Sequence, residues 1–150
     1  MTAQGGDLLA WLETAITERE DAARLATQGV WRTHDTHLDL GGHTATVLVG
    51  ERNDTELLAW LPTMSHAPWD EARNAWNNAE HIAANDPASV LRRCAADRKL
   101  IADHGPWSAT DRSCKGCGFD NHEEPMVTDY SDCPVLNGIA EGYGWTEGKR

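Results

Sequence analysis

The chain has 150 residues, of which 40% are hydrophobic, and carries a formal net charge of −11 with a pI near 4.9. This length suits a single domain over residues 1–150, which buries roughly 68–70% of the surface of its unfolded chain. The acidity works against generic nucleic-acid binding, which depends on Lys and Arg to neutralise phosphates. The sequence shows no signal peptide and no membrane-spanning run, so we expect a soluble, cytoplasmic protein without a membrane partner.

The first predicted element is a long N-terminal helix. Asp7 is a residue type that caps helices, and Leu8, Leu12 and Ile16 recur at helical spacing after it. Gly29 suits the C-terminal end. We therefore expect a helix that starts after Asp7 and ends near Gly29.

A small antiparallel sheet is predicted next. Alternating residues flank Gly41-Gly42, which indicates a β-hairpin with a two-residue turn, and a third strand is expected over Glu56–Leu61. In this register Leu40 pairs with His43. One face is then buried and consists of Leu38, Leu40, Ala45, Val47 and Val49, whereas the opposite face, which includes Thr46, is exposed.

The histidines of the hairpin raise the question of a second metal site. His34 and His37 are three residues apart, so a regular strand directs them to opposite faces. In the predicted register His43 shares a face with His34, but at a separation of roughly 20 Å. We therefore expect no metal site in the hairpin.

Two more helices are expected before the cysteine-rich region. The first covers Trp69–Asn85, with Trp76 and Ala79 on its apolar face. Asp86-Pro87 then supplies an N-cap and a proline at the first helical position, so the second begins there and continues to about His104. The predicted fold class is α+β: a long N-terminal helix, a three-stranded meander, an antiparallel pair formed by these two helices, and a C-terminal zinc knuckle with a short helix.

The segment SCKGCGFDNHEEPMVTDYSDCP, residues 113–134, holds three of the four cysteines. Cys114 and Cys117 are spaced to bind one ion, and the glycines allow a tight turn that directs amide groups at the sulfurs. Cys133 precedes Pro134 at the expected start of a short helix, where the helix dipole stabilises a thiolate. A redox Cys-x-x-Cys pair would need a βαβ context, which is missing. The pattern predicts a zinc site, with residues 105–150 as a zinc-stabilised subregion.

Tetrahedral zinc needs a fourth ligand besides the three cysteines. Cys94 and His104 lie on the same predicted helix, ten residues or roughly 15 Å apart, so one zinc cannot bind both. Cys94 shares the apolar face of that helix and is expected in the core. His104 ends the helix, and nine residues separate it from Cys114. We therefore favour His104 as the fourth ligand.

Two other histidines remain candidates. His122 lies five residues after Cys117, in a loop long enough to reach the metal, and is the alternative fourth ligand. Its neighbours in HEEP are typical of an exposed segment. His81 is expected to be an ordinary histidine, either on the surface of its helix or in helix packing.

Taken together, these residues resemble an uncharacterised family, a domain of unknown function found in small zinc-knuckle proteins of actinobacteria and their phages. The resemblance rests on ATQGVW, AEHIAANDPASVLRR, IADH, CKGCG, and CPVLNGIA followed by Tyr143. It implies a metal set of His104, Cys114, Cys117 and Cys133, and it implies no activity. The chain departs from the family pattern at Gln28 and Val30, where prolines are usual, and at Asn85, where a second histidine often occurs.

Three classes of function follow from these features. The favoured class is a non-catalytic protein that binds another protein, because four protein ligands leave zinc no position for a reactive water. A deaminase-like zinc enzyme is an alternative, but Ser113 replaces the proline of that motif and the only His-x-Glu, at His122, follows the knuckle. The other alternative is an acidic phage effector, such as a DNA mimic or anti-defence protein, acting in the host cytoplasm.

Overall fold

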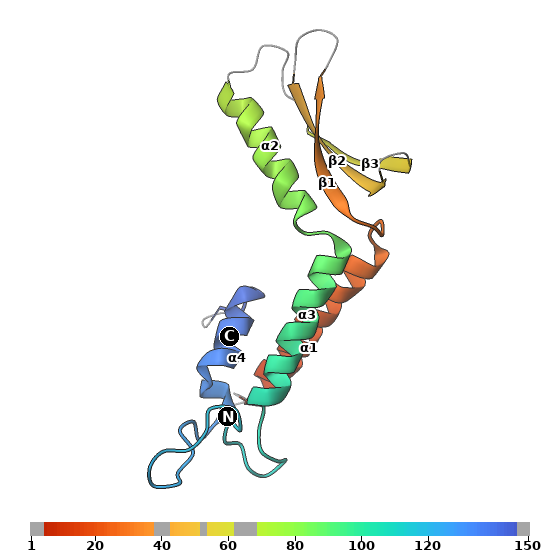
Figure 1. The fold of residues 1–150 in the computed structure, drawn as a ribbon. Helices are drawn as coiled ribbons and strands as arrows, with labels where there is room; N and C mark the ends of the chain where they lie inside the picture. The colour runs from red at the N-terminus through yellow and green to blue at the C-terminus, as the bar shows by residue number, and fades with distance from the viewer. Residues whose placement is uncertain (1–4, 38–42, 52–53, 62–68, 147–150) are drawn as a thin grey trace. The chain divides into compact units, whose positions relative to one another are not determined.

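The computed structural model describes residues 5–37, 43–51, 54–61 and 69–146 (Figure 1). Its fold class is α+β, as predicted. The elements in chain order are α1 (Gly5–Leu25), β1 (Trp31–His37), β2 (His43–Glu51), β3 (Asp54–Leu61), α2 (Trp69–Ala83), α3 (Pro87–His104), the 3-10 helix η1 (Tyr130–Asp132) and α4 (Pro134–Gly142). Among the described residues, no helix combines the length and apolar character needed to traverse a bilayer.

The chain forms two compact units. The first comprises Met1–Glu20 with Arg93–Arg150 and is called the metal-site unit after the candidate site predicted in it; the second, the sheet unit, comprises Asp21–Arg92. Helices α1 and α3 each contribute residues to both units. The single domain expected over residues 1–150 stays a prediction, and its subregion 105–150 falls within the metal-site unit.

In the sheet unit, α2 packs on an antiparallel sheet with the strand order β1-β2-β3. The core of this unit consists of Val47 and Ala45 from β2 with Ala75 and Ala79 from α2. Trp76 was predicted on the apolar face of α2 but is 36% exposed. Ala75 takes the buried position instead, because small side chains allow the helix to approach the sheet closely.

The register of the hairpin differs from the prediction. His43 pairs with His37, and Val49 pairs with Trp31. The predicted pairing of His43 with Leu40 is therefore wrong; Leu40, Gly41 and Gly42 lie outside the described residues. An odd shift in register exchanges the two faces of a strand, and here it places Trp31 against the core. The Trp31 indole also donates to the Thr27 carbonyl at 2.9 Å, which holds the ring in place.

The face assignments predicted for β2 are confirmed only in part. Ala45, Val47 and Val49 are buried, as predicted. Thr46 was predicted to be exposed but is only 6% exposed, and its hydroxyl donates to the His34 carbonyl at 3.1 Å. The backbones of His37 and His43 are directly opposite one another, a pair that the argument from His34 did not consider.

In the metal-site unit, α3 runs antiparallel beside α1 (Figure 1). The Arg98 guanidinium of α3 donates to Glu13 at 2.6 Å and to Glu20 at 3.0 Å. These carboxylates, Glu20 first, raise the pKa of Arg98 above its ordinary value. The antiparallel pairing predicted for α2 with α3 stays a prediction, because α2 and most of α3 belong to different units; within the sheet unit the apolar face of α2 packs on the sheet.

The ends of these helices show which local signals were reliable. Asp86 accepts a hydrogen bond from the Ser89 amide at 2.6 Å, which is the predicted N-cap of α3. Helix α1 begins at Gly5, so Asp7 lies inside its first turn and is not the N-cap. It ends at Leu25, and Gly29 follows in the left-handed region with φ 128°.

The core of the metal-site unit joins α1 to the cysteine-rich segment. Its buried members are Leu8, Leu12, Cys114, Tyr130, Cys133, Leu136 and Ala140. Trp11 of α1 packs edge-on against Trp145 with ring centroids 4.9 Å apart. Two of the predicted zinc ligands are thus part of an apolar core, which keeps water away from their sulfurs.

Candidate metal centre

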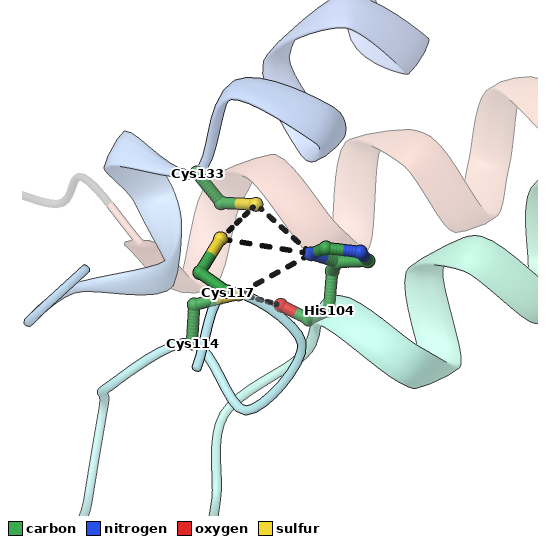
Figure 2. Close-up of side chains that lie close together, drawn as sticks. All are labelled: His104, Cys114, Cys117 and Cys133. Carbon is green, nitrogen blue, oxygen red and sulfur yellow. Dashed lines mark hydrogen bonds between the residues drawn. The ribbon is translucent and has the colours of Figure 1, made fainter. Parts of the chain in front are cut away.

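His104, Cys114, Cys117 and Cys133 converge on one point from three separate segments (Figure 2). His104 is the last residue of α3, the first two cysteines belong to the knuckle, and Cys133 precedes α4. The His104 Nδ1 lies 3.5 Å from the sulfurs of Cys114 and Cys133. It lies 3.7 Å from the Cys117 sulfur, which is 3.6 Å from the Cys133 sulfur.

These distances fit the edges of a tetrahedral zinc site. With Zn–S near 2.3 Å and Zn–N near 2.0–2.1 Å, tetrahedral geometry requires about 3.8 Å between sulfurs and about 3.5 Å between sulfur and nitrogen. All four ligand atoms lie within 4.8 Å of one another. A disulfide would bring two sulfurs to about 2.05 Å, so the cysteines are arranged as separate ligands.

Glycines allow the knuckle to fold tightly against α3. A side-chain carbon at Gly116 would lie 2.8 Å from the His104 Nδ1 and 2.7 Å from the Asp103 carbonyl oxygen, so only glycine fits there. Gly118 adopts φ 77°, in the left-handed region that glycine tolerates. The turn directs the amides of Gly116 and Cys117 at the Cys114 sulfur. This is the role predicted for the glycines of CKGCG.

The two knuckle thiols differ in their proton affinity. Burial raises the pKa of Cys114, but hydrogen bonds from the neighbouring cysteines and from the amides of Cys117 and Gly116 outweigh it and lower the pKa below its ordinary value. Burial and the two neighbouring cysteine sulfurs raise the pKa of Cys117 to about 12. Without a metal, the cluster therefore holds Cys117 as a neutral thiol at neutral pH.

Cys133 is held at the start of α4, where the sequence predicted it. Pro134 is the first residue of that helix, and Cys133 is its N-cap. The side-chain amide of Asn137 donates to the carbonyls of Ser131 at 2.8 Å and Cys133 at 3.0 Å, which fixes the backbone just before α4. The Cys133 side chain is fully buried, in the core that α1 contributes to.

An ion pair that sequence reasoning missed supports the loop between the cysteines. The Arg112 guanidinium donates to both oxygens of Asp129 at 2.8 and 2.9 Å, and lies over the Tyr130 ring. The Asp129 carboxylate also accepts from the amide and hydroxyl of Ser131. The Arg112 guanidinium, ahead of the Ser131 donors, lowers the pKa of Asp129 to about 2. The two residues are 17 positions apart, so no local sequence pattern predicts the ion pair.

The other candidate ligands lie away from the cluster. His122 is exposed, and its amide donates to Asp120 in a turn. His81 is exposed near the end of α2. Cys94 is fully buried and its sulfur lies 3.6 Å from the Tyr143 hydroxyl, which donates to Asp97 at 2.7 Å. Cys94 is therefore a core residue, as predicted, and Tyr143 is a neighbour that the helical pattern alone did not reveal.

Residues 5–144 match the family of unknown function DUF6221. The chain belongs to that family, and the match spans all four clustered residues. No curated protein and no solved structure matches the chain.

Proposed function

We propose that this member of the family is a non-catalytic protein in which His104, Cys114, Cys117 and Cys133 bind one structural zinc ion. The convergence of the four ligand atoms carries the proposal, together with the agreement of the three Nδ1–sulfur distances and the Cys117–Cys133 sulfur distance with the edges of a zinc tetrahedron. Three thiolates and one imidazole are ligands that zinc prefers, whereas a mononuclear iron site of this kind would favour a fourth thiolate. His122 is not required, because His104 already completes the set.

A structural role is favoured by where the ligands come from. The zinc would join the end of α3, the knuckle and the start of α4, three segments that no regular sheet connects in the described residues. Between His104 and Pro134, the only helix is the 3-10 helix η1, and the strand-like pairs are isolated bridges at Pro106 and Phe119. Because four protein ligands close the tetrahedron, no position is left for a water that zinc could activate, which argues against a zinc hydrolase or deaminase.

We predict one equivalent of zinc per chain in protein purified without chelator. The measurement is elemental analysis of the purified protein, with protein concentration from amino-acid analysis. A chain in which Cys114 and Cys117 are both replaced by serine is the matched control and should retain less than a tenth of the zinc. Iron in place of zinc, or less than half an equivalent of zinc, would contradict the proposed site.

The affinity for zinc should fall as the pH falls. The pKa of Cys117 is about 12 without metal, whereas the ligand is the thiolate, so binding releases at least one proton. Each proton released weakens the apparent affinity by about tenfold per unit of pH decrease. Competition with a chelator of known affinity between about pH 6 and about pH 8 measures this slope. An affinity that does not change over this interval would show that thiolates are not the ligands.

The biological task that we propose is binding to another protein. The net charge of −11 disfavours generic nucleic acid and favours a partner with basic residues. A small, acidic, zinc-stabilised protein of this kind suits an accessory or regulatory role in the cytoplasm of an actinobacterium or of a phage-infected host. An acidic phage effector that imitates DNA is a narrower version of the same proposal, and binding to a host DNA-binding protein would distinguish it.

A further inference from the structure

We propose that the loops around the metal centre form a docking surface for a basic segment of a partner protein, one that carries arginine or lysine beside a large apolar side chain. The surface consists of the aromatic pair Trp107 and Phe119 and the acidic turn Asp120–Glu124. The inference rests on the proposed function, since it assigns a surface and a partner chemistry to a protein-binding role.

The aromatic pair is exposed although an apolar core lies in the same unit. Trp107 is 50% exposed and Phe119 is 52% exposed. Their ring centroids are 6.0 Å apart with the planes inclined by 38°, so the two rings form one continuous aromatic surface. Two large side chains that contact each other and remain half exposed are typical of an interaction site.

The loops that carry the rings are held by backbone hydrogen bonds at the knuckle. The Trp107 amide donates to the Ser113 carbonyl at 3.2 Å, next to the ligand Cys114. Phe119 faces Pro125 in a bridge, and the Met126 amide donates to the Gly118 carbonyl at 3.0 Å. The rings are therefore presented in a fixed arrangement, which lowers the entropy that a partner must overcome on binding.

The turn that closes the Phe119 hairpin supplies negative charge beside the rings. The Asp120 amide donates to the Glu124 carbonyl at 2.8 Å, and Glu123 stands at the tip with φ 63°. All three acidic residues are exposed. Within the part of the chain that the structure describes, neither Glu123 nor Glu124 forms an ion pair.

The charge of the whole segment has the same sign. From Gly105 to Asp132 the chain holds six acidic and two basic residues, a net charge of −4 with histidine neutral. Of the two bases, Arg112 is already paired with Asp129, and Lys115 lies on the knuckle. The surface is therefore complementary to a cationic partner rather than to phosphate.

The combination of aromatic rings and carboxylates defines the occupant. An arginine guanidinium or a lysine ammonium can lie over the face of Trp107 or Phe119 and be attracted by the ring. A carboxylate of the adjacent turn then balances its charge, and the partner's apolar side chain covers the rest of the rings. Neither duplex DNA nor an anionic membrane offers this combination.

The test is a selection of random displayed dodecapeptides on the zinc-loaded full chain. Enriched peptides should combine arginine or lysine with a large apolar residue. Their affinity should fall by about tenfold or more in Trp107→Ala and in Phe119→Ala. Trp76→Ala removes a 36% exposed tryptophan from α2 of the sheet unit and should leave affinity unchanged.

A variant that keeps both aromatic rings distinguishes the effect of the acidic charges on binding from an effect of misfolding. Glu123→Gln combined with Glu124→Gln should weaken the basic peptides while zinc content stays at one equivalent. Four results would each contradict the proposed docking surface. They are selection of acidic or uncharged peptides, equal affinity of the selected peptides for the ring variants, no enrichment of any peptide, and tighter binding of duplex DNA than of peptide. If one of these results is obtained with protein that contains zinc, only the docking surface is contradicted and the structural zinc site still stands. If the protein contains no zinc, the proposed function itself is contradicted.

Discussion

His104→Ala is expected to lose tight zinc binding and to loosen the chain from Gly105 to Cys133. The variant leaves three thiolates, so zinc must recruit a water in place of the imidazole. Structural zinc contributes about 10–16 kcal/mol of apparent binding free energy in finger peptides, and a loss of even a quarter of this exceeds the usual effect of a point mutation. Chelator competition measures the zinc affinity, and limited proteolysis locates the loosened segment.

His122→Ala is the matched control for that experiment. The residue is exposed in the acidic turn and lies outside the ligand cluster, so its removal should change stability by no more than about 0.5 kcal/mol. Zinc affinity and the proteolysis pattern should remain those of the unaltered protein. The opposite result, in which His122→Ala loses zinc to a chelator and His104→Ala keeps it, would assign the fourth ligand to His122.

Gly116→Ala should weaken the zinc site without removing any ligand. The added carbon would lie 2.7 Å from the Asp103 carbonyl oxygen and 2.8 Å from the His104 ring, closer than such carbons approach other atoms. The carbonyl belongs to the last turn of α3 and cannot move alone, so either the imidazole or the knuckle is displaced. Overpacking of this kind costs about 1–3 kcal/mol, and we expect zinc affinity to fall by about tenfold or more.

Gly138→Ala provides the control for the effect of adding a methyl group. Gly138 lies in α4, and a carbon added there meets nothing within 4 Å. Alanine in a helix should stabilise the protein by about 0.5–1 kcal/mol. Gly116 does not adopt a positive φ, so its variant tests crowding rather than backbone strain. Chelator competition that ranks the two variants equally would show that close contact with His104 is not essential.

The clustering of three cysteines with His104 was predictable from sequence because the chemistry of a metal site restricts the residues that can form it, and metal binding itself stays a prediction. Cys114 and Cys117 have the spacing that one ion requires, and Cys133 stands before a proline that starts a helix. Helix geometry then placed Cys94 and His104 too far apart to share a metal. The structure brings His104 to the three cysteines and leaves Cys94 and His122 outside the cluster.

The features that were missed depend on contacts between distant segments. Alternation in β2 identified Val47 as buried, but the register of β1 depends on where Trp31 packs, which the strand pattern does not encode. The partner of α3 likewise depends on Arg98 meeting acids on α1, about eighty residues earlier in the chain. Local signals need only adjacent residues; the Asp86 cap was correct, whereas Asp7 is not the N-cap of α1.

The discontinuity of the metal-site unit sets an order for biosynthesis. Its two parts, Met1–Glu20 and Arg93–Arg150, enclose the whole sheet unit in the sequence. Translation adds about 5–20 residues per second. Roughly ten seconds therefore pass between the synthesis of Leu12 and that of its core partner Leu136. Cys133 also emerges late, so the proposed zinc site can be completed only when translation is nearly finished. During that interval the apolar face of α1, with Leu8 and Leu12, lacks the C-terminal residues that bury it in the folded chain.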